Sequence, residues 1–278
     1  MNATAAMQLE YTGERVVPGM TPEITFREHQ MRYAFAGQFV PGRIVLDIAS
    51  GSGIGTDYLR RAGALTCFGL DLDRAALHYA RSRFSLGHLA ACDAIRLCLA
   101  SQSVDVIVSF ETIEHLPDPP AFLCECERVL RPGGLLICST PNRDITRWDQ
   151  ENPFHVAEMP VRDFSRQVNE FFRDSRLYGQ GSVPYPLYVA KKKIARTLKK
   201  LHLKDWVKRR LHLPVDTVCS EVEFVDCNGD ERYAVNPRPP RWPNRSRYAI
   251  VVARKSSKNE NKNKNENGNK NGNEKGIG

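Results

Sequence analysis

Short apolar segments that alternate with helix-like segments constrain the fold of this chain more than any other feature. Seven segments have the composition of β-strands, at residues 44–48, 66–70, 88–91, 104–110, 135–140, 176–178 and 247–253. Helix-like stretches separate several of them. Strands that are apolar on both sides and alternate with helices are typical of a parallel sheet that helices cover on both faces. We therefore predict an α/β fold.

Composition agrees with a globular α/β chain. The sequence has 278 residues, of which 41% are hydrophobic and 26% charged, and its net charge is +8. Such a composition supports a full core and excludes a collagen-like, coiled-coil or wholly disordered chain. No apolar run approaches the roughly 18 residues of a membrane-spanning helix, and the N-terminal residues lack the pattern of a signal peptide. We expect a cytoplasmic location.

The cysteines support the same expectation. Eight are present, and no two have CxxC spacing. Several lie in apolar, strand-like runs, such as Cys67 and Cys138. We predict buried, free thiols in a reducing compartment and no bound metal, with a zinc site or a disulfide framework as the alternative.

Positive charge is concentrated in two segments. Residues 190–213 contain ten basic residues and one acidic residue, and residues 254–278 contain seven basic and three acidic ones. The rest of the chain is therefore acidic overall. Residues 255–278 are mostly Asn, Lys, Glu and Gly and can bury little apolar surface, so we predict a disordered tail after a domain that spans 1–254.

Segment 190–213 also has apolar residues at helical spacing between its lysines and arginines. The spacing changes phase near residue 203, which predicts two short, basic, amphipathic helices. Contact with an anionic membrane surface is one interpretation, and it would suit a lipid-linked substrate. Contact with nucleic acid is an interpretation that we do not favour. The remaining alternative is a helix packed on the domain, with its lysines solvated.

A glycine-rich turn follows the first predicted strand. The stretch VLDIASGSGIGT, residues 45–56, places Asp47 in that strand and glycines at 51, 53 and 55. Such a turn lets the backbone approach a ligand closely, and the helix that follows offers its N-terminus to polar groups. Alone, the motif also fits a dinucleotide-binding domain, and its glycines could serve the turn geometry only.

Further motifs follow the next strands in order. Asp71 ends the second strand, where a carboxylate can accept the hydroxyls of an adenosine ribose or cap the next helix. Asp93 follows the third strand, and the fourth runs into FETIEHLPDP, before the later stretch RVLRPGGLLICSTPNR. With these motifs, the chain resembles the class I S-adenosylmethionine-dependent methyltransferases, a group that includes ubiquinone-type and sugar or natural-product O-methyltransferases.

The resemblance covers about residues 11–181 and the last strand. It implies a Rossmann-like sheet of seven mostly parallel strands whose last strand is antiparallel, with a substrate-side insertion at about 181–246. The implied cofactor is S-adenosylmethionine. The residues that the resemblance assigns to the methionine part are Asp47, Ala49, Ser50, Gly51 and Gly53. Those assigned to the ribose, the adenine and the methyl-transfer side are Asp71, Leu72, Asp93, Ala94, Phe110 and Glu111.

The glycine turn departs from two related patterns. Ala49 stands where the usual methyltransferase motif has its first glycine, and alanine is a frequent variant in this group. The spacing GxGxG in place of GxGxxG argues against a pyrophosphate-binding dehydrogenase.

Two histidines are the candidate catalytic residues. His115 and His155 follow the fourth and fifth strands, at the end of the sheet where such folds bind ligands. An unperturbed imidazole, with a pKa of about 6.5, suits removal of a hydroxyl proton. In the resembling proteins both segments border the acceptor site. The structural alternatives are that His115 braces its loop and that His155 caps the helix near Met159, while Glu158 is a candidate to orient His155.

The N-terminal segment 11–19 also resembles a stretch of bacterial members of the group. We expect it to fold over the acceptor site, with Arg32 and Tyr33 near the methionine carboxylate. The predicted function is methyl transfer to a small-molecule, saccharide-like or lipid-linked acceptor, with a hydroxyl as the expected group. The alternatives are C- or N-methylation of a quinone precursor or other metabolite, and a non-catalytic, cofactor-binding adaptor for nucleic acid or a protein partner.

Overall fold

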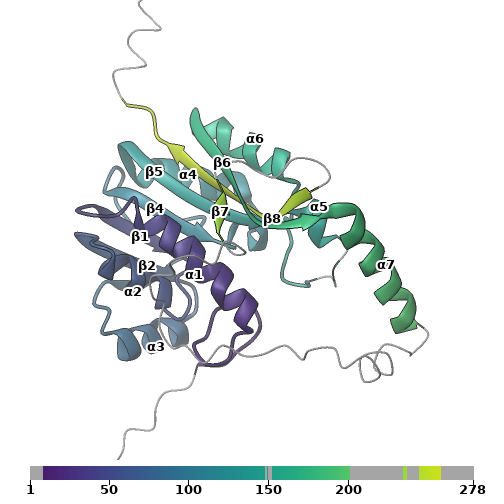
Figure 1. The fold of residues 1–278 in the computed structure, drawn as a ribbon. Helices are drawn as coiled ribbons and strands as arrows, with labels where there is room; N and C mark the ends of the chain where they lie inside the picture. Colours follow the sequence, from purple (N-terminus) through teal and green to yellow (C-terminus); the bar gives the residue numbers. More distant parts are fainter. Residues whose placement is uncertain (1–8, 148, 150–151, 201–233, 237–243, 258–278) are drawn as a thin grey trace, which may run out of the picture.

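An eight-stranded sheet forms the centre of the molecule (Figure 1). The computed structural model describes residues 9–147, 149, 152–200, 234–236 and 244–257. The strands, in chain order, are β1 (Ile44–Ile48), β2 (Thr66–Asp71), β3 (Leu89–Ala91), β4 (Val104–Phe110), β5 (Leu130–Pro141), β6 (Asp174–Pro184), β7 (Val235–Asn236) and β8 (Asn244–Arg254).

The sheet has the order β3-β2-β1-β4-β5-β8-β6-β7. Strands β1 to β5 pair in parallel, and β8 lies antiparallel between β5 and β6. The predicted α/β, Rossmann-like sheet with an antiparallel last strand is therefore confirmed. The one addition is β7, which pairs with β6 and makes the eighth strand. Two residues are too few to produce a strand pattern in the sequence.

Helices cover both faces of the sheet (Figure 1). The elements are α1 (Glu23–Gly37), α2 (Ile54–Arg61), α3 (Arg74–Phe84), the 3₁₀ helix η1 (Ile113–His115), α4 (Pro119–Val129), α5 (Arg143–Thr146), α6 (Val161–Phe171) and α7 (Tyr185–Lys200). One core joins α1, α2 and α3 to the sheet, and the other joins α4 and α6 to its opposite face. This two-sided covering explains why the central strands are apolar throughout.

Strands β6 and β8 are longer than their apolar segments predicted. Their pairing continues to Pro184 and Asn244, so it includes both ends of the segment that the sequence assigned to an insertion. Within the described part of that segment lie α7 and β7. The second predicted basic helix, beyond residue 200, and the tail from residue 258 lie outside the described residues. No helix in the described ranges is both long and apolar enough to cross a bilayer.

The cysteines of the described residues are free thiols. Cys67, Cys126 and Cys138 are buried, whereas Cys98 and Cys124 are exposed. The expectation of free thiols is met at these positions, while the expectation of burial holds only for the cysteines in strands and on the inner face of α4.

Gly53 brings α2 and α3 together at the end of the glycine turn. It has φ +80°, a left-handed conformation that glycine adopts without strain, and it is the residue that precedes α2. A Cβ atom at this position would lie 2.4 Å from the Cβ of Ala80 in α3. The turn therefore needs glycine here both for its backbone angles and for helix packing.

We expect Gly53→Ala to destabilise the protein more than the same change at a left-handed glycine in open space. Gly42 supplies the control, because it has φ +69° and a Cβ added to it would meet no atom within 4 Å. Gly42→Ala should cost about 1–2 kcal/mol through backbone strain alone. Gly53→Ala should cost about 1–3 kcal/mol more, because the added methyl overpacks the α2–α3 contact. Urea unfolding of both variants measures the difference, and equal losses would refute the packing argument.

Candidate active site

A cavity of about 490 Å³ lies where strands β1, β2, β3 and β4 end. Its lining includes residues that directly follow these four strands. In an open parallel sheet this edge is where ligands bind, because the connections to the helices diverge there. Eight of the eleven predicted cofactor residues line the cavity, namely Ala49, Ser50, Gly51, Asp71, Leu72, Ala94, Phe110 and Glu111. Asp47, Gly53 and Asp93 are not among its lining residues.

The turn after β1 forms one wall. Ala49 and Gly51 both have positive φ angles, 58° and 53°, so the chain reverses tightly over the cavity. The backbone N–H of Ser50 donates to the carbonyl of Leu70, which ties the turn to β2. The hydroxyl oxygens of Ser50 and Ser52 are buried and have no hydrogen-bond partner among the described residues. Both serines line the cavity, so a polar ligand would satisfy groups that otherwise cost free energy.

Asp47 lies behind this wall, fully buried. Its carboxylate accepts hydrogen bonds from the hydroxyls of Tyr33 at 3.0 Å and Thr56 at 2.6 Å. Burial raises the pKa of Asp47 to about 7, against the effect of these two hydrogen bonds. Asp47 is not among the lining residues of the cavity, and its predicted role toward the methionine part stays a prediction. Asp47 holds Tyr33, whose ring does line the cavity.

Asp71 connects the turn to the end of β2. Its carboxylate accepts from the backbone N–H of Gly51 at 2.7 Å and from that of Asp73 at 2.8 Å. The alternative role of Asp71 as a helix cap is wrong, because Asp73 is the N-cap of α3 and accepts from Ala75 and Ala76. Asp71 thus lies in the cavity wall with an orientation fixed by two backbone donors.

The third and fourth strands complete the wall. After β3, Ala94 lines the cavity, while the Asp93 carboxylate accepts from the backbone N–H of Ile95 at 3.1 Å. After β4, Glu111 has φ 52° and accepts from the Ser139 hydroxyl at 2.6 Å. Burial raises the pKa of Glu111, although the Arg32 guanidinium opposes the shift. The hydrogen bond from Ile95 shows that the Asp93 carboxylate stabilises the turn that follows β3.

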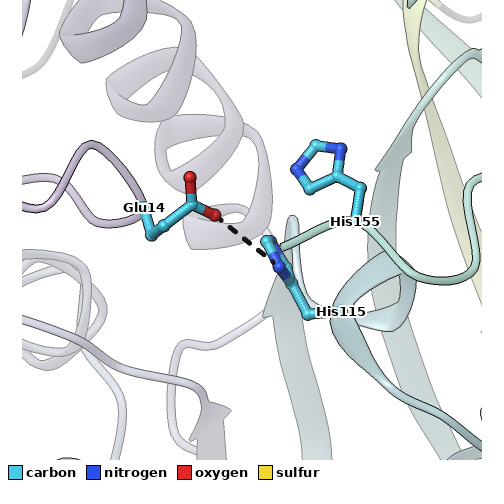
Figure 2. A group of neighbouring side chains, drawn as sticks. All are labelled: Glu14, His115 and His155. Carbon is cyan, nitrogen blue, oxygen red and sulfur yellow. Dashed lines mark ion pairs between the residues drawn. The ribbon is translucent and has the colours of Figure 1, made fainter. Parts of the chain in front are cut away.

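Both predicted catalytic histidines lie close to Glu14 (Figure 2), and of the three residues Glu14 and His115 line the cavity. His115 Nδ1 is 3.7 Å from a Glu14 carboxylate oxygen and 3.1 Å from the carbonyl oxygen of Phe154. The rings of His115 and His155 meet edge to face, with centroids 4.6 Å apart. Burial, together with the neighbouring His155, lowers the pKa of His115. We call Glu14, His115 and His155 the acceptor-end cluster.

Glu158 holds His155 as the sequence suggested. The Nδ1 atom of His155 contacts a Glu158 carboxylate oxygen, and the other oxygen accepts from the Thr146 hydroxyl at 2.5 Å. Although burial opposes it, hydrogen bonds from His155 and Thr146 lower the pKa of Glu158. The alternative that His155 caps the next helix is wrong, because α6 begins after Pro160 without a side-chain cap.

A second cavity of about 220 Å³ adjoins the first. The two share lining residues, among them Glu14, His29, Glu111 and His115, and the second is also lined by His155. Burial, reinforced by the Arg32 guanidinium, lowers the pKa of His29 to about 3, so its ring is neutral at pH 7. The shared lining places the acceptor-end cluster where the two cavities meet.

The N-terminal segment borders both cavities, as predicted. Tyr11 and Gly13 line the second cavity, and Glu14 lines both. Arg32 differs from its prediction, because its guanidinium is buried and donates to Gln180 at 2.7 Å, away from the lining of either cavity. The contribution of Glu14 was missed, since nothing in its local sequence indicates which side chains it will meet.

Comparisons with known proteins agree with this geometry. The family model of the methyltransferase domain matches residues 46–138. A Mycolicibacterium smegmatis protein named as a probable S-adenosylmethionine-dependent methyltransferase is 41% identical over 162 residues, which cover 56% of this chain and 62% of that protein. The chain thus spans less than two thirds of this relative's length. A ubiquinone biosynthesis O-methyltransferase of Cereibacter sphaeroides is 36% identical over 108 residues, 37% of this chain and 43% of that one.

A solved structure shares the fold. The S-adenosylmethionine-dependent methyltransferase structure from Thermotoga maritima superposes with a TM-score of 0.55 at 15% identity, over 84% of this chain and 92% of that chain. Residues 46–138 of the chain therefore belong to the methyltransferase-domain family. The cofactor of this family is S-adenosylmethionine, and the unpartnered serine hydroxyls, the tight turn and Asp71 fit such a polar, adenosine-bearing group.

The buried carboxyl of Asp47 makes the stability of the methyltransferase domain depend on pH. The folded protein retains this proton up to about pH 7, whereas the unfolded chain loses it near 3.8. The free energy of unfolding should therefore fall as pH rises from 4 to 7 in the wild type, relative to Asp47→Asn, which has no proton to lose. Urea unfolding of both proteins across this range measures the difference. Other buried acids are common to both proteins, so a difference that stays constant with pH would contradict the raised pKa.

Proposed function

We propose that the protein transfers a methyl group from S-adenosylmethionine to a hydroxyl of a small-molecule or saccharide-like acceptor. The observation that supports this most is the continuity of the two cavities. The larger is walled by the glycine turn and Asp71, and the smaller meets it at His115 and Glu14. Cofactor and acceptor would therefore occupy adjoining spaces, as an in-line displacement requires.

The cofactor would lie against the ends of β1 to β4. Asp71 would accept the ribose hydroxyls, and the two backbone donors that fix its carboxylate support this role. Ser50 and Ser52 offer hydroxyls without partners among the described side chains, and Gly51 presents backbone without a Cβ. The side chains of Leu72 and Ala94 supply apolar surface for the adenine.

When bound, the cofactor supplies a methyl group on a sulfonium. The acceptor oxygen would form a bond to that carbon while the carbon–sulfur bond breaks, with its electron pair going to sulfur. The hydroxyl proton must then be removed. The protein's task is then to position the hydroxyl and remove its proton. His115 and His155 are the predicted residues for this, and the acceptor-end cluster places both beside the second cavity.

The lining of the second cavity favours an acceptor with several polar groups. Besides the cluster it includes the side chains of Thr146, Asn152, Arg247 and Tyr248. Thr146, Asn152 and Tyr248 can both donate and accept hydrogen bonds, and Arg247 donates, as hydroxyl-rich acceptors require. The name of the Cereibacter relative, an O-methyltransferase, supports oxygen as the methylated atom. Methylation of a carbon or nitrogen atom is therefore the alternative to methylation of oxygen.

Two substitutions should separate cofactor binding from turnover. Asp71→Ala should weaken S-adenosylhomocysteine binding roughly ten- to a hundredfold, because it removes hydrogen bonds to a charged group. His155→Ala should leave that affinity nearly unchanged and lower methyl transfer by roughly a hundredfold or more. Calorimetric titration measures the first effect. Transfer of a radiolabelled methyl group to a panel of methyl glycosides, catechols and amines measures the second.

Asp163→Ala is the matched control for Asp71→Ala. Asp163 is an acid on α6, which packs on the face of the sheet opposite to α1, α2 and α3. It should change neither affinity nor turnover. A folded wild type that fails to bind S-adenosylhomocysteine would contradict the proposal and favour a non-catalytic adaptor. Transfer to the amines alone would show N-methylation in place of O-methylation.

We further propose that α7 contacts an anionic membrane surface, which would bring a lipid-linked acceptor to a cytoplasmic enzyme. The helix extends away from the sheet at the edge of the molecule (Figure 1). One side is anchored by Asp149, which accepts from the Tyr188 hydroxyl at 2.6 Å and pairs with Lys192. Leu187 and Ile194 lie on another side, 54% and 61% exposed. An exposed apolar stripe beside lysines is typical of helices that bind the membrane interface.

Charge reversal on α7 tests this contact. The wild type should co-sediment with phosphatidylglycerol vesicles at low salt and leave phosphatidylcholine vesicles unbound. Lys191→Glu with Lys193→Glu should weaken binding at least about tenfold, since each lysine near such a surface contributes about 1 kcal/mol. Arg162→Glu with Arg166→Glu on α6 is the charge-matched control and should bind like the wild type. Failure of the wild type to bind anionic vesicles would end the membrane proposal.

A further inference from the structure

The acceptor-end cluster has the composition of a metal site. Glu14, His115 and His155 each offer one ligand atom, and these atoms all lie within 4.8 Å of one another. They come from three separate segments, namely the N-terminal segment, η1 and the loop before α6. Figure 2 shows the carboxylate and the two rings gathered around a common space. Two imidazoles and one carboxylate are a ligand set that first-row divalent metals accept.

The partners of the two imidazoles strengthen this assignment. His155 Nδ1 contacts the Glu158 carboxylate, and His115 Nδ1 is 3.1 Å from the Phe154 carbonyl oxygen. Both partners are acceptors, so each hydrogen bond requires a proton on Nδ1. A neutral ring then has its lone pair on Nε2, and in His115 the Nδ1 atom is also the one that lies 3.7 Å from the Glu14 carboxylate. Histidines that bind metals through one nitrogen usually donate the other N–H to a carboxylate or a carbonyl, which fixes the ring and its tautomer.

The surroundings of the cluster also suit a cation. Glu14 accepts from the Asn152 side-chain amide at 3.1 Å, which orients its carboxylate toward the histidines. Glu111 and Glu114 line the second cavity together with the cluster. One carboxylate oxygen of Glu114 is buried without a hydrogen-bond partner in the described part of the chain. Glu114 lines the same cavity as the cluster, where a cation or its water ligands would offset the cost of burying this oxygen.

We infer that Glu14, His115 and His155 bind a divalent transition-metal ion such as Zn²⁺, and that this ion holds the acceptor hydroxyl. The second clause rests on the proposed function, because it needs an acceptor in the second cavity. A Lewis acid there lowers the pKa of a hydroxyl that contacts it. The histidines then serve as ligands, and the proton of the acidified hydroxyl passes to water in the cavity, without either histidine as its base. The site was not expected from the sequence, which predicted no metal.

Direct titration with Co²⁺ tests the inference without an acceptor. Tag-free protein is treated with a chelator, dialysed, and titrated by calorimetry and visible absorption. The wild type should bind one Co²⁺ per chain. Glu14→Gln and His155→Ala should each weaken binding at least about tenfold. His78→Ala is the matched control, because His78 is exposed on α3 and should leave Co²⁺ affinity unchanged.

S-Adenosylhomocysteine binding by the same samples reports whether each variant is folded. It also separates this inference from the proposed function. Co²⁺ affinity that is equal in the wild type, Glu14→Gln and His155→Ala would overturn the metal site, and retained S-adenosylhomocysteine binding would leave the proposed function standing. Intense ultraviolet bands from cobalt–thiolate bonds would also overturn it, since they would place the ion on an exposed cysteine such as Cys98 or Cys124.

Discussion

The buried carboxyl group of Asp47 joins the three elements that shape the cofactor side of the cavity. It lies on β1, and the two hydroxyls that it accepts from belong to Tyr33 on α1 and Thr56 on α2. This contact requires the Tyr33 ring to pass very close to α2. A Cβ on Gly55 would lie 2.0 Å from that ring, so glycine at this position is what lets the three elements meet. The motif glycines therefore serve packing as much as ligand access.

Two of the four non-glycine residues with positive φ in the described part of the chain lie on the two sides of the same cavity. Ala49 follows β1 and Glu111 follows β4, and both have positive φ angles although neither is glycine. Each such residue costs of order 1–3 kcal/mol and persists only where its surroundings hold it. For Ala49 the surroundings are the turn that Ser50 ties to β2. For Glu111 they are two hydrogen bonds with the Ser139 hydroxyl, which accepts from the Glu111 backbone N–H and donates to the Glu111 carboxylate. The strain thus lies where the two strands present their ends to a ligand.

The sequence was most informative where function and fold use one contiguous stretch. The strands, the glycine turn and Asp71 could be predicted because period, turn chemistry and spacing are local properties. The exact role of each residue could not be predicted from the sequence. Gly53 proved to be a packing residue, and Asp47 lies behind the wall, because both depend on contacts with α1 and α3. The end of β6 was also missed, since a Gly- and Pro-containing strand has no apolar alternation.

The acceptor side could be predicted only in part, and the reason bears on specificity. The proposed cofactor residues fall within 47–111, inside the matched family domain. Of the acceptor-end cluster only His115 lies in that domain, while Glu14 precedes it and His155 follows it. A local pattern indicated that His115 and His155 reach the same edge of the sheet, but no pattern indicates that Glu14 meets them. Changes in the outer segments can therefore alter the acceptor while the cofactor wall stays intact. In a fold built this way, resemblance to a family identifies the shared chemistry, whereas most residues that line the proposed acceptor cavity lie outside the shared domain.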